Sequence, residues 1–227
     1  MTTTHADHSA YVSLLLADGR LPTGAHTQSA GVEPALRHGL RLDQVPDYLR
    51  ARLTTVTEVE AAAAVVARHR WLSTPDVRRL AEADRAWRVR TASAALRDAS
   101  DLLGRSYLRL AATVWPRLAP LAVDRTPWCR AAVIGATAAE AGLTAEQAAR
   151  LIGFDEVQTV TAAALKLQPF DPAVAVAWSL AAGDLVETMV SRVAGLTEPD
   201  EIPAYAAPQI EHWAELHTRT ERRLFRA

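Results

Sequence analysis

Alanine constrains the fold of this chain more than any other feature, since 46 of its 227 residues are alanine. Alanine has the highest helix propensity, and no segment of useful length alternates apolar and polar residues as a half-buried strand does. Because only three Phe and four Tyr are present, the helices must pack closely through small side chains. The sequence therefore predicts an all-α fold, a single-domain bundle of about eight to ten helices.

The expected domain organisation is simple. Residues 1–8 are polar and are expected to form a disordered tail, and residues 9–227 are expected to form one all-helical domain. Apolar residues recur at helical spacing through most of that domain. The expected helices cover residues 11–17, 27–38, 45–71, 77–98, 101–115, 127–141, 144–167, 171–194 and 209–225.

Helix-breaking and capping residues set most of these boundaries. The segment 73–76 contains Pro75 and Asp76 and predicts the end of one helix and the start of the next. Gly39 and Gly142 follow expected helix ends, where a left-handed backbone is common. Residues 144–147 resemble an imperfect capping box.

Charge and cysteine content limit the possible functions. The formal net charge is −1, which argues against a nucleic-acid partner because phosphate binding needs clustered Lys and Arg. Cys129 is the single cysteine, so a reducing compartment is expected. Residues 1–7 lack the apolar core of a signal peptide, and no apolar stretch reaches the roughly 18 to 20 residues of a membrane span. The sequence therefore predicts a cytoplasmic protein without membrane partners.

Motifs for nucleotide and metal chemistry are absent from the sequence. There is no Gly-x4-Gly-Lys-[Ser/Thr] P-loop and no His-Glu-x-x-His. The spacing of His212 and His217 does not place them on one helix face as well as a spacing of four would, and His5 and His8 lie in the expected tail. Cys129 is expected to be a buried, unreactive thiol in an apolar helix. The sequence predicts no catalytic residue, no metal site and no cofactor.

The segment 21–33 is the first candidate site. Pro22 fixes φ and Gly24 permits a positive φ, so a tight bend is expected before a helix that carries Glu33. A shaped loop beside a helix start is typical of a functional surface, and a capped helix–helix connection explains the same residues equally well. His26 contacts a partner in the first interpretation and caps locally in the second.

The C-terminal segment is the second candidate site. Trp213 is expected to pack onto the core of its own subunit. Leu224 and Phe225 lie at the chain end, where chains usually fray, and Arg226 follows them. An apolar pair at a terminus indicates that something covers it. A partner groove and the body of the same subunit are both possible covers.

These motifs, in this order, resemble the UreF family of urease accessory proteins. The resemblance rests on Leu-Pro-x-Gly and Ser-x-Gly-hydrophobic-Glu in residues 21–33, and on the terminal His-x5-Arg-Leu-Phe-Arg of residues 217–226. The segments 103–111 and 132–135 resemble a Gly-Arg helix and the apolar helix that follows it, so nearly the whole chain is covered. The resemblance implies partner-binding residues at Leu21, Pro22, Thr23, Gly24, His26, Ser29, Glu33, Gly104, Arg105, His217, Arg223, Leu224, Phe225 and Arg226.

Departures from the family pattern indicate a divergent member. Residues 26–29 read His-Thr-Gln-Ser where many UreF proteins have Phe-Ser-Tyr-Ser. Thr218 replaces the usual Glu after the C-terminal His, and Ala227 replaces a final Ser. The Pro-Leu-Gly-Gln segment of the family is represented only by residues 168–171.

The resemblance implies a non-enzymatic urease maturation factor. Such a protein joins a UreD/UreH-type scaffold and a UreG-type GTPase, modulates the GTPase activity and helps to deliver nickel to apo-urease. The family is typically dimeric, so a homodimer is expected.

Two other classes of protein remain open on the sequence alone. The first is a helical interaction protein of another kind, such as a ligand-responsive transcription regulator, although residues 1–50 contain no convincing basic helix-turn-helix. The second is a small helical enzyme with unrecognised chemistry.

Overall fold

The computed structural model describes residues 3–23, 27–123, 127–220 and 224–225, without the side chains of residues 3–7. These residues form one all-α domain in which no strand occurs, so the predicted fold class is confirmed. Ten of the described helices have nine or more residues, and two are shorter. The helices are α1 (Thr3–Leu16), α2 (Val32–Arg37), α3 (Val45–Leu53), α4 (Val56–Ser73), α5 (Val77–Arg90), α6 (Ala94–Val114), α7 (Ala119–Val123), α8 (Arg130–Glu140), α9 (Ala145–Leu167), α10 (Pro172–Ala181), α11 (Gly183–Val193) and α12 (Pro208–Thr218).

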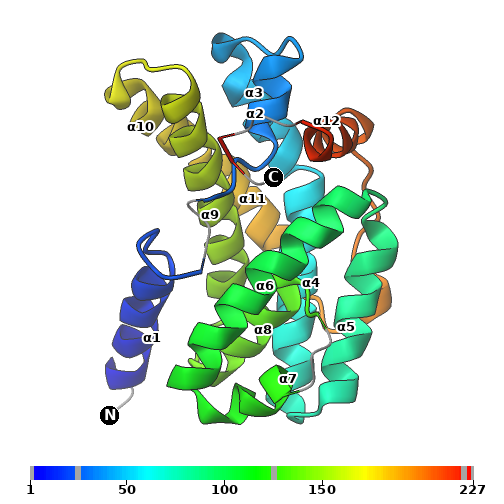
Figure 1. Cartoon of the computed structure of the whole chain (residues 1–227). Coiled ribbons are helices and arrows are strands. Elements are labelled where there is room, and N and C mark those ends of the chain that lie inside the picture. Colours follow the sequence, from blue (N-terminus) through cyan, green and yellow to red (C-terminus); the bar gives the residue numbers. More distant parts are fainter. Residues whose placement is uncertain (1–2, 24–26, 124–126, 221–223, 226–227) are drawn as a thin grey trace.

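The centre of the core is α4, which packs against α5, α8 and α9 (Figure 1). Residues 61–67 of α4 are all buried and are all Ala or Val. At Gly135 of α8, an added Cβ would collide with the carbonyl oxygen of Ala64. The alanine-rich composition therefore serves close helix contacts, because small side chains let two helix backbones approach each other.

The remaining helices surround this centre. Helix α6 packs on α8, α11 and α10 pack on α9, and α1 runs beside α9 (Figure 1). At one end of the molecule α12 contacts both α2 and α6, which brings the C-terminal helix next to the first candidate segment.

Several expected helices are divided where a cap or a turn intervenes. The expected helix 77–98 stops at Arg90, because the Ser93 hydroxyl accepts the Leu96 N–H at 3.2 Å and starts α6 there. The expected helix 171–194 is split at Ala182 into α10 and α11. The helical pattern over 45–71 is interrupted at residues 54–55, between α3 and α4.

The two ends of the chain also differ from expectation. Helix α1 begins at Thr3, so the structure has helix where residues 3–8 were expected to be disordered. Each residue added to an existing helix gains one hydrogen bond. This gain accounts for the extension of the expected helix 11–17 towards the N-terminus. Helix α12 ends at Thr218 instead of continuing to Phe225, since the Thr220 N–H bonds the His217 carbonyl and closes the last turn.

Three boundary predictions are confirmed, and one is corrected. Gly39 and Gly142 have positive φ directly after helix ends, and Asp76 caps α5 through the Arg78 N–H. Thr144 and Gln147 form a complete capping box. The expectation of an imperfect box was therefore wrong, because the residue at the third helical position is Gln147.

One stretch is more apolar than the sequence analysis recognised. Among the described residues, α10 and α11 taken together, Pro172–Val193, are long and apolar enough to cross a membrane by length and composition. Only 22% of this stretch is buried. Helix α10 in particular buries a single residue, Ala175, so its apolar side chains lie mostly on the surface.

Candidate functional site

Glu33 holds the C-terminal tail against the body of the protein. Its carboxylate lies in the first turn of α2 and is completely buried. Oε1 accepts the N–H of Leu224 at 2.9 Å, and Oε2 accepts the N–H of Phe225 at 2.8 Å. Arg37 donates to Oε1 at 2.7 Å. A buried carboxylate needs such charge-assisted partners, so the two candidate segments of the sequence form one structural unit.

His217 fastens the same tail from α12. Its Nε2 donates to the Phe225 carbonyl oxygen at 3.1 Å and lies 3.8 Å from Glu33 Oε2. The imidazole is almost fully buried. Both sides of the Phe225 residue are thus held, its N–H by Glu33 and its carbonyl by His217. Ser29, whose hydroxyl accepts the Glu33 N–H, supports this arrangement. We call Ser29, Glu33, His217 and Phe225 the tail clasp.

The two apolar residues of the tail have different environments. Phe225 is 5% exposed, and the ammonium group of Lys166 lies 5.6 Å from its ring centroid. Leu224 is 63% exposed. The body of the same subunit therefore covers Phe225, and Leu224 remains on the surface.

A strained turn precedes Glu33. Ser29 is buried, and its hydroxyl accepts the Glu33 N–H at 3.4 Å. Ala30 and Gly31 have φ of 48° and 76°, in the left-handed region that side chains disfavour. The Tyr48 hydroxyl donates to the Ala30 carbonyl at 2.7 Å, and a Cβ on Gly31 would lie 2.7 Å from that hydroxyl. Sequence reasoning did not select Gly31 or Tyr48 as site residues, although the glycine of the Ser-x-Gly motif was a usable signal.

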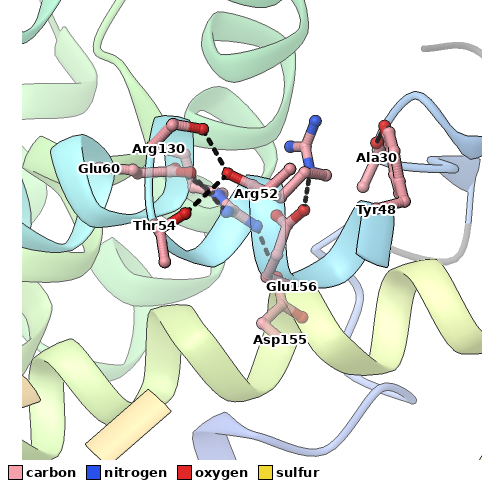
Figure 2. Close-up of polar contacts among 10 residues, drawn as sticks. Ala30, Tyr48, Arg52, Thr54, Glu60, Arg130, Asp155 and Glu156 are labelled. Atoms are coloured by element: carbon pink, nitrogen blue, oxygen red, sulfur yellow. Dashed lines mark hydrogen bonds and ion pairs between the residues drawn. The ribbon is translucent and has the colours of Figure 1, made fainter. Parts of the chain in front are cut away.

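A buried ionic network lies beneath this turn (Figure 2). Arg52 of α3 donates through Nε to Glu156 of α9. Arg130, at the start of α8, donates to both carboxylate oxygens of Glu60 on α4, at 2.7 and 2.8 Å, and to Asp155 on α9 at 2.5 Å. Four helices are therefore joined through charges, none of which the sequence analysis had assigned to a site.

Pairing keeps the two buried arginines charged. Burial is the largest single effect on Arg130 and would lower its pKa, but Glu60, Asp155 and Glu156 together outweigh burial and raise it. The pKa of Arg52 is raised in the same way, because Glu156 and Tyr48 together outweigh burial. Burial raises the pKa of Asp155. The ion pairs hold α3 against α9, and α8 against α4 and α9, because removing one partner of a buried pair would leave an uncompensated charge.

Burial also governs the single thiol. Cys129 lies at the N-terminus of α8 and is fully buried. Burial raises the pKa of this thiol well above its usual value, so the thiolate is disfavoured, as the sequence predicted. Within the part of the chain that the structure describes, no group of three or more His, Cys, Asp or Glu residues is placed to hold a metal ion.

The other candidate residues lie outside the tail clasp. Leu21, Pro22 and Thr23 form the turn after α1, where the Thr23 N–H bonds the Leu21 carbonyl at 2.7 Å. Gly104 lies where α6 crosses the start of α8, and an added Cβ would collide with the Trp128 carbonyl oxygen. Arg105 is exposed on α6. Gly24, His26, Arg223 and Arg226 lie outside the described residues.

The protein is all-α, and Glu33, near the start of the chain, binds the backbone of Leu224 and Phe225, near its end. Similarity to known proteins identifies the family to which this all-α protein belongs. The UreF family matches residues 42–183. The urease accessory protein UreF of Mycobacterium marinum is 34% identical over 215 residues, covering 93% of this chain and 96% of the relative. UreF of Mycobacterium tuberculosis is 31% identical over 220 residues, covering 96% and 98%. The chain belongs to the UreF family of urease accessory proteins.

Proposed function

We propose that this chain is a non-enzymatic urease maturation factor in the cytoplasm. It assembles with a UreD/UreH-type scaffold and a UreG-type GTPase, modulates that GTPase and helps to deliver nickel to apo-urease. The observation that carries this proposal is the similarity to urease accessory proteins over almost the entire chain, at 34% identity for the Mycobacterium marinum protein. The terminal motifs that resemble the family are also the ones that meet in the tail clasp.

The surface beside the tail clasp suits a partner. Leu224 is exposed directly next to the buried Phe225, and the Arg37 side chain is 43% exposed beside Glu33. Arginine is enriched at protein interfaces, and the buried centre of an interface is more apolar than its rim. We assign this surface to the UreD/UreH-type partner.

Co-purification tests the proposal. The full chain is expressed with a UreD/UreH-type protein, a UreG-type protein and apo-urease, with and without GTP and nickel, and the complexes are isolated. We expect a stable complex with the scaffold and urease activity that depends on this chain. If the chain neither joins the complex nor raises the nickel content of urease, the proposed function is wrong.

A matched pair of variants tests the partner surface. Leu224→Glu places a charge on the assigned surface and is expected to weaken complex formation without changing the melting temperature. Val89→Glu is the control, because Val89 is 74% exposed on α5. Equal binding by both variants would contradict the assignment of this surface.

The segment 21–25, whose residues 21–23 form the turn after α1, is a second proposed contact. Thr23→Lys changes a side chain in this turn without changing the backbone preference. We expect a nearly unchanged melting temperature and weaker assembly. Assembly at the wild-type level with every partner would remove this turn from the interface.

GTP hydrolysis belongs to the partner GTPase in this scheme. The sequence has no P-loop, so the isolated chain should not bind GTP with Mg²⁺. Calorimetric titration measures this directly, and micromolar affinity would contradict the adaptor role.

A homodimer formed through α9 and α10 accounts for the exposed apolar surface. Val176 and Leu180 on α10 are 59% and 76% exposed, and Phe154 on α9 is also exposed. A groove of about 590 Å³ lies between these helices and α11. Helix α10 contains no charged residue. Apolar patches of this kind mark interaction sites in soluble proteins, and a neutral helix can pair with its own copy about a two-fold axis.

A further inference from the structure

A cavity of about 110 Å³ lies beneath the turn of residues 29–31. Of the tail clasp residues, His217 alone lines it. The cavity is lined by Gln28, Gly31, Arg52 and His217, among other residues. Apolar side chains of α4, α5 and α6, including Val59, Trp87 and Leu103, also line it. The cavity is several times the roughly 30 Å³ that one water occupies, and a cavity of about 150 Å³ takes benzene.

Two buried donors at this cavity make no hydrogen bond of ordinary length and angle in the described part of the protein, and the Tyr48 hydroxyl is the polar group beside Arg52. They are Nε2 of Gln28 and Nη1 of Arg52, on side chains that are more than nine-tenths buried. Figure 2 shows that the Arg52 guanidinium meets Glu156 through one contact, with its outer nitrogens directed away from that carboxylate. Unpaired buried donors are costly, so a ligand that brings an acceptor oxygen is favoured here.

The charges around the cavity determine the class of ligand. The lining contains three arginines and three glutamates: Arg52, Arg90, Arg130, Glu60, Glu156 and Glu211. A charged ligand would add an uncompensated charge to this balanced lining, which is expensive at low dielectric. An uncharged ligand adds none.

We propose that this cavity binds a small uncharged molecule with a carbonyl oxygen at one end and a short apolar body. The oxygen accepts from Gln28 Nε2 and Arg52 Nη1, and the apolar body lies along Val59 and Leu103. The proposal does not depend on the role in urease maturation.

Propionamide and propionate are the probes, because they share a shape and differ in charge. Each is titrated into the ¹⁵N-labelled full chain, and the backbone amide of Gly31 and the Arg52 Nε–H are followed by NMR. We expect saturable shifts at both positions with propionamide and at least tenfold weaker binding of propionate. Absence of saturable shifts with propionamide would leave only water in the cavity and overturn the proposal. Equal or tighter binding of propionate would overturn the charge argument and with it the proposed class of ligand.

Variants identify the donors. Gln28→Met keeps the length of the side chain without the amide donor, and Arg52→Lys keeps the charge without Nη1. We expect each to weaken propionamide binding by about tenfold. Gln209→Met, at an exposed position of α12, should bind as the wild type does. Circular dichroism shows whether each variant folds. If one of the two variants unfolds, the binding affinity of the other tests the proposal. Wild-type affinity in a folded Gln28→Met or Arg52→Lys protein would overturn the proposal.

Discussion

At the scale of single residues, the tail depends on the carboxylate of Glu33. It accepts two backbone N–H groups and one guanidinium while completely buried. Glu33→Gln keeps the shape but replaces one acceptor oxygen by a donor that faces a backbone N–H. Since hydrogen bonds to charged groups contribute about 1.5–3 kcal/mol, we expect the free energy of unfolding to fall by about that amount.

Urea denaturation measures this change, and Glu187→Gln is its control. Glu187 pairs with Arg150 on the surface, with both side chains about half exposed, so its loss should cost less than about 1 kcal/mol. A Glu33→Gln protein as stable as the control would mean that the clasp does not contribute to folding.

Gly31 is the second residue with a sharply defined role. Its φ of 76° disfavours any side chain, and an added Cβ would lie 2.7 Å from the Tyr48 hydroxyl. We expect Gly31→Ala to destabilise the fold by about 1–3 kcal/mol. Gly183→Ala is the matched control, because nothing lies within 4 Å of a Cβ there. Similar thermal denaturation of the two variants would contradict this role.

At the scale of helices, α12 caps α6 as well as carrying His217. The Glu215 carboxylate accepts the Ser93 hydroxyl at 2.6 Å and the Ala95 N–H at 3.0 Å. The Ser93 hydrogen bond is the main reason that the pKa of Glu215 is lowered. A carboxyl whose pKa is lower in the folded state stabilises the protein above its unfolded pKa, and this contribution is lost as pH falls through the folded pKa.

This linkage predicts a pH dependence. Glu215→Gln should be less stable than the wild type at neutral pH, and the difference should shrink as the pH falls below the usual range for a glutamate. Thermal unfolding from pH 7 to pH 3 measures it. A difference that stays constant over this range would mean that the charge of Glu215 is irrelevant to the α6–α12 contact.

At the scale of the whole molecule, the apolar face of α9 and α10 is the surface through which we propose that two copies join. Leu180 is 76% exposed, so Leu180→Glu should not disturb the monomer fold. If this face joins two copies, the substitution places two charges near the two-fold axis and should yield monomers. Light scattering after size exclusion gives the mass. Val89→Glu, at a 74% exposed position of α5, should remain dimeric. Dimers of Leu180→Glu would exclude this face.

The sequence by itself determined the fold class and, to within three residues, the starts of half of the described helices: α3, α5, α8, α9, α10 and α12. Alanine content and helical periodicity are local properties, and caps such as Asp76 and Asp171 bond an N–H only two residues away. The left-handed backbone conformation of Gly39 and Gly142 is likewise a local property. The Ser93 cap was also visible in the sequence, but the continuing helical pattern around it outweighed it.

Only the tertiary structure decided how the candidate segments come together. The hydrogen bond from the Phe225 N–H to Glu33 spans 192 residues, and the ion pair between Arg52 and Glu156 spans 104. Side chains at such separations have no shared periodicity or spacing, so their pairing follows from the packing of the helices between them. That packing ends the last helix at Thr218 and places Leu224 and Phe225 against Glu33, where Phe225 is buried and the buried carboxylate gains two hydrogen bonds.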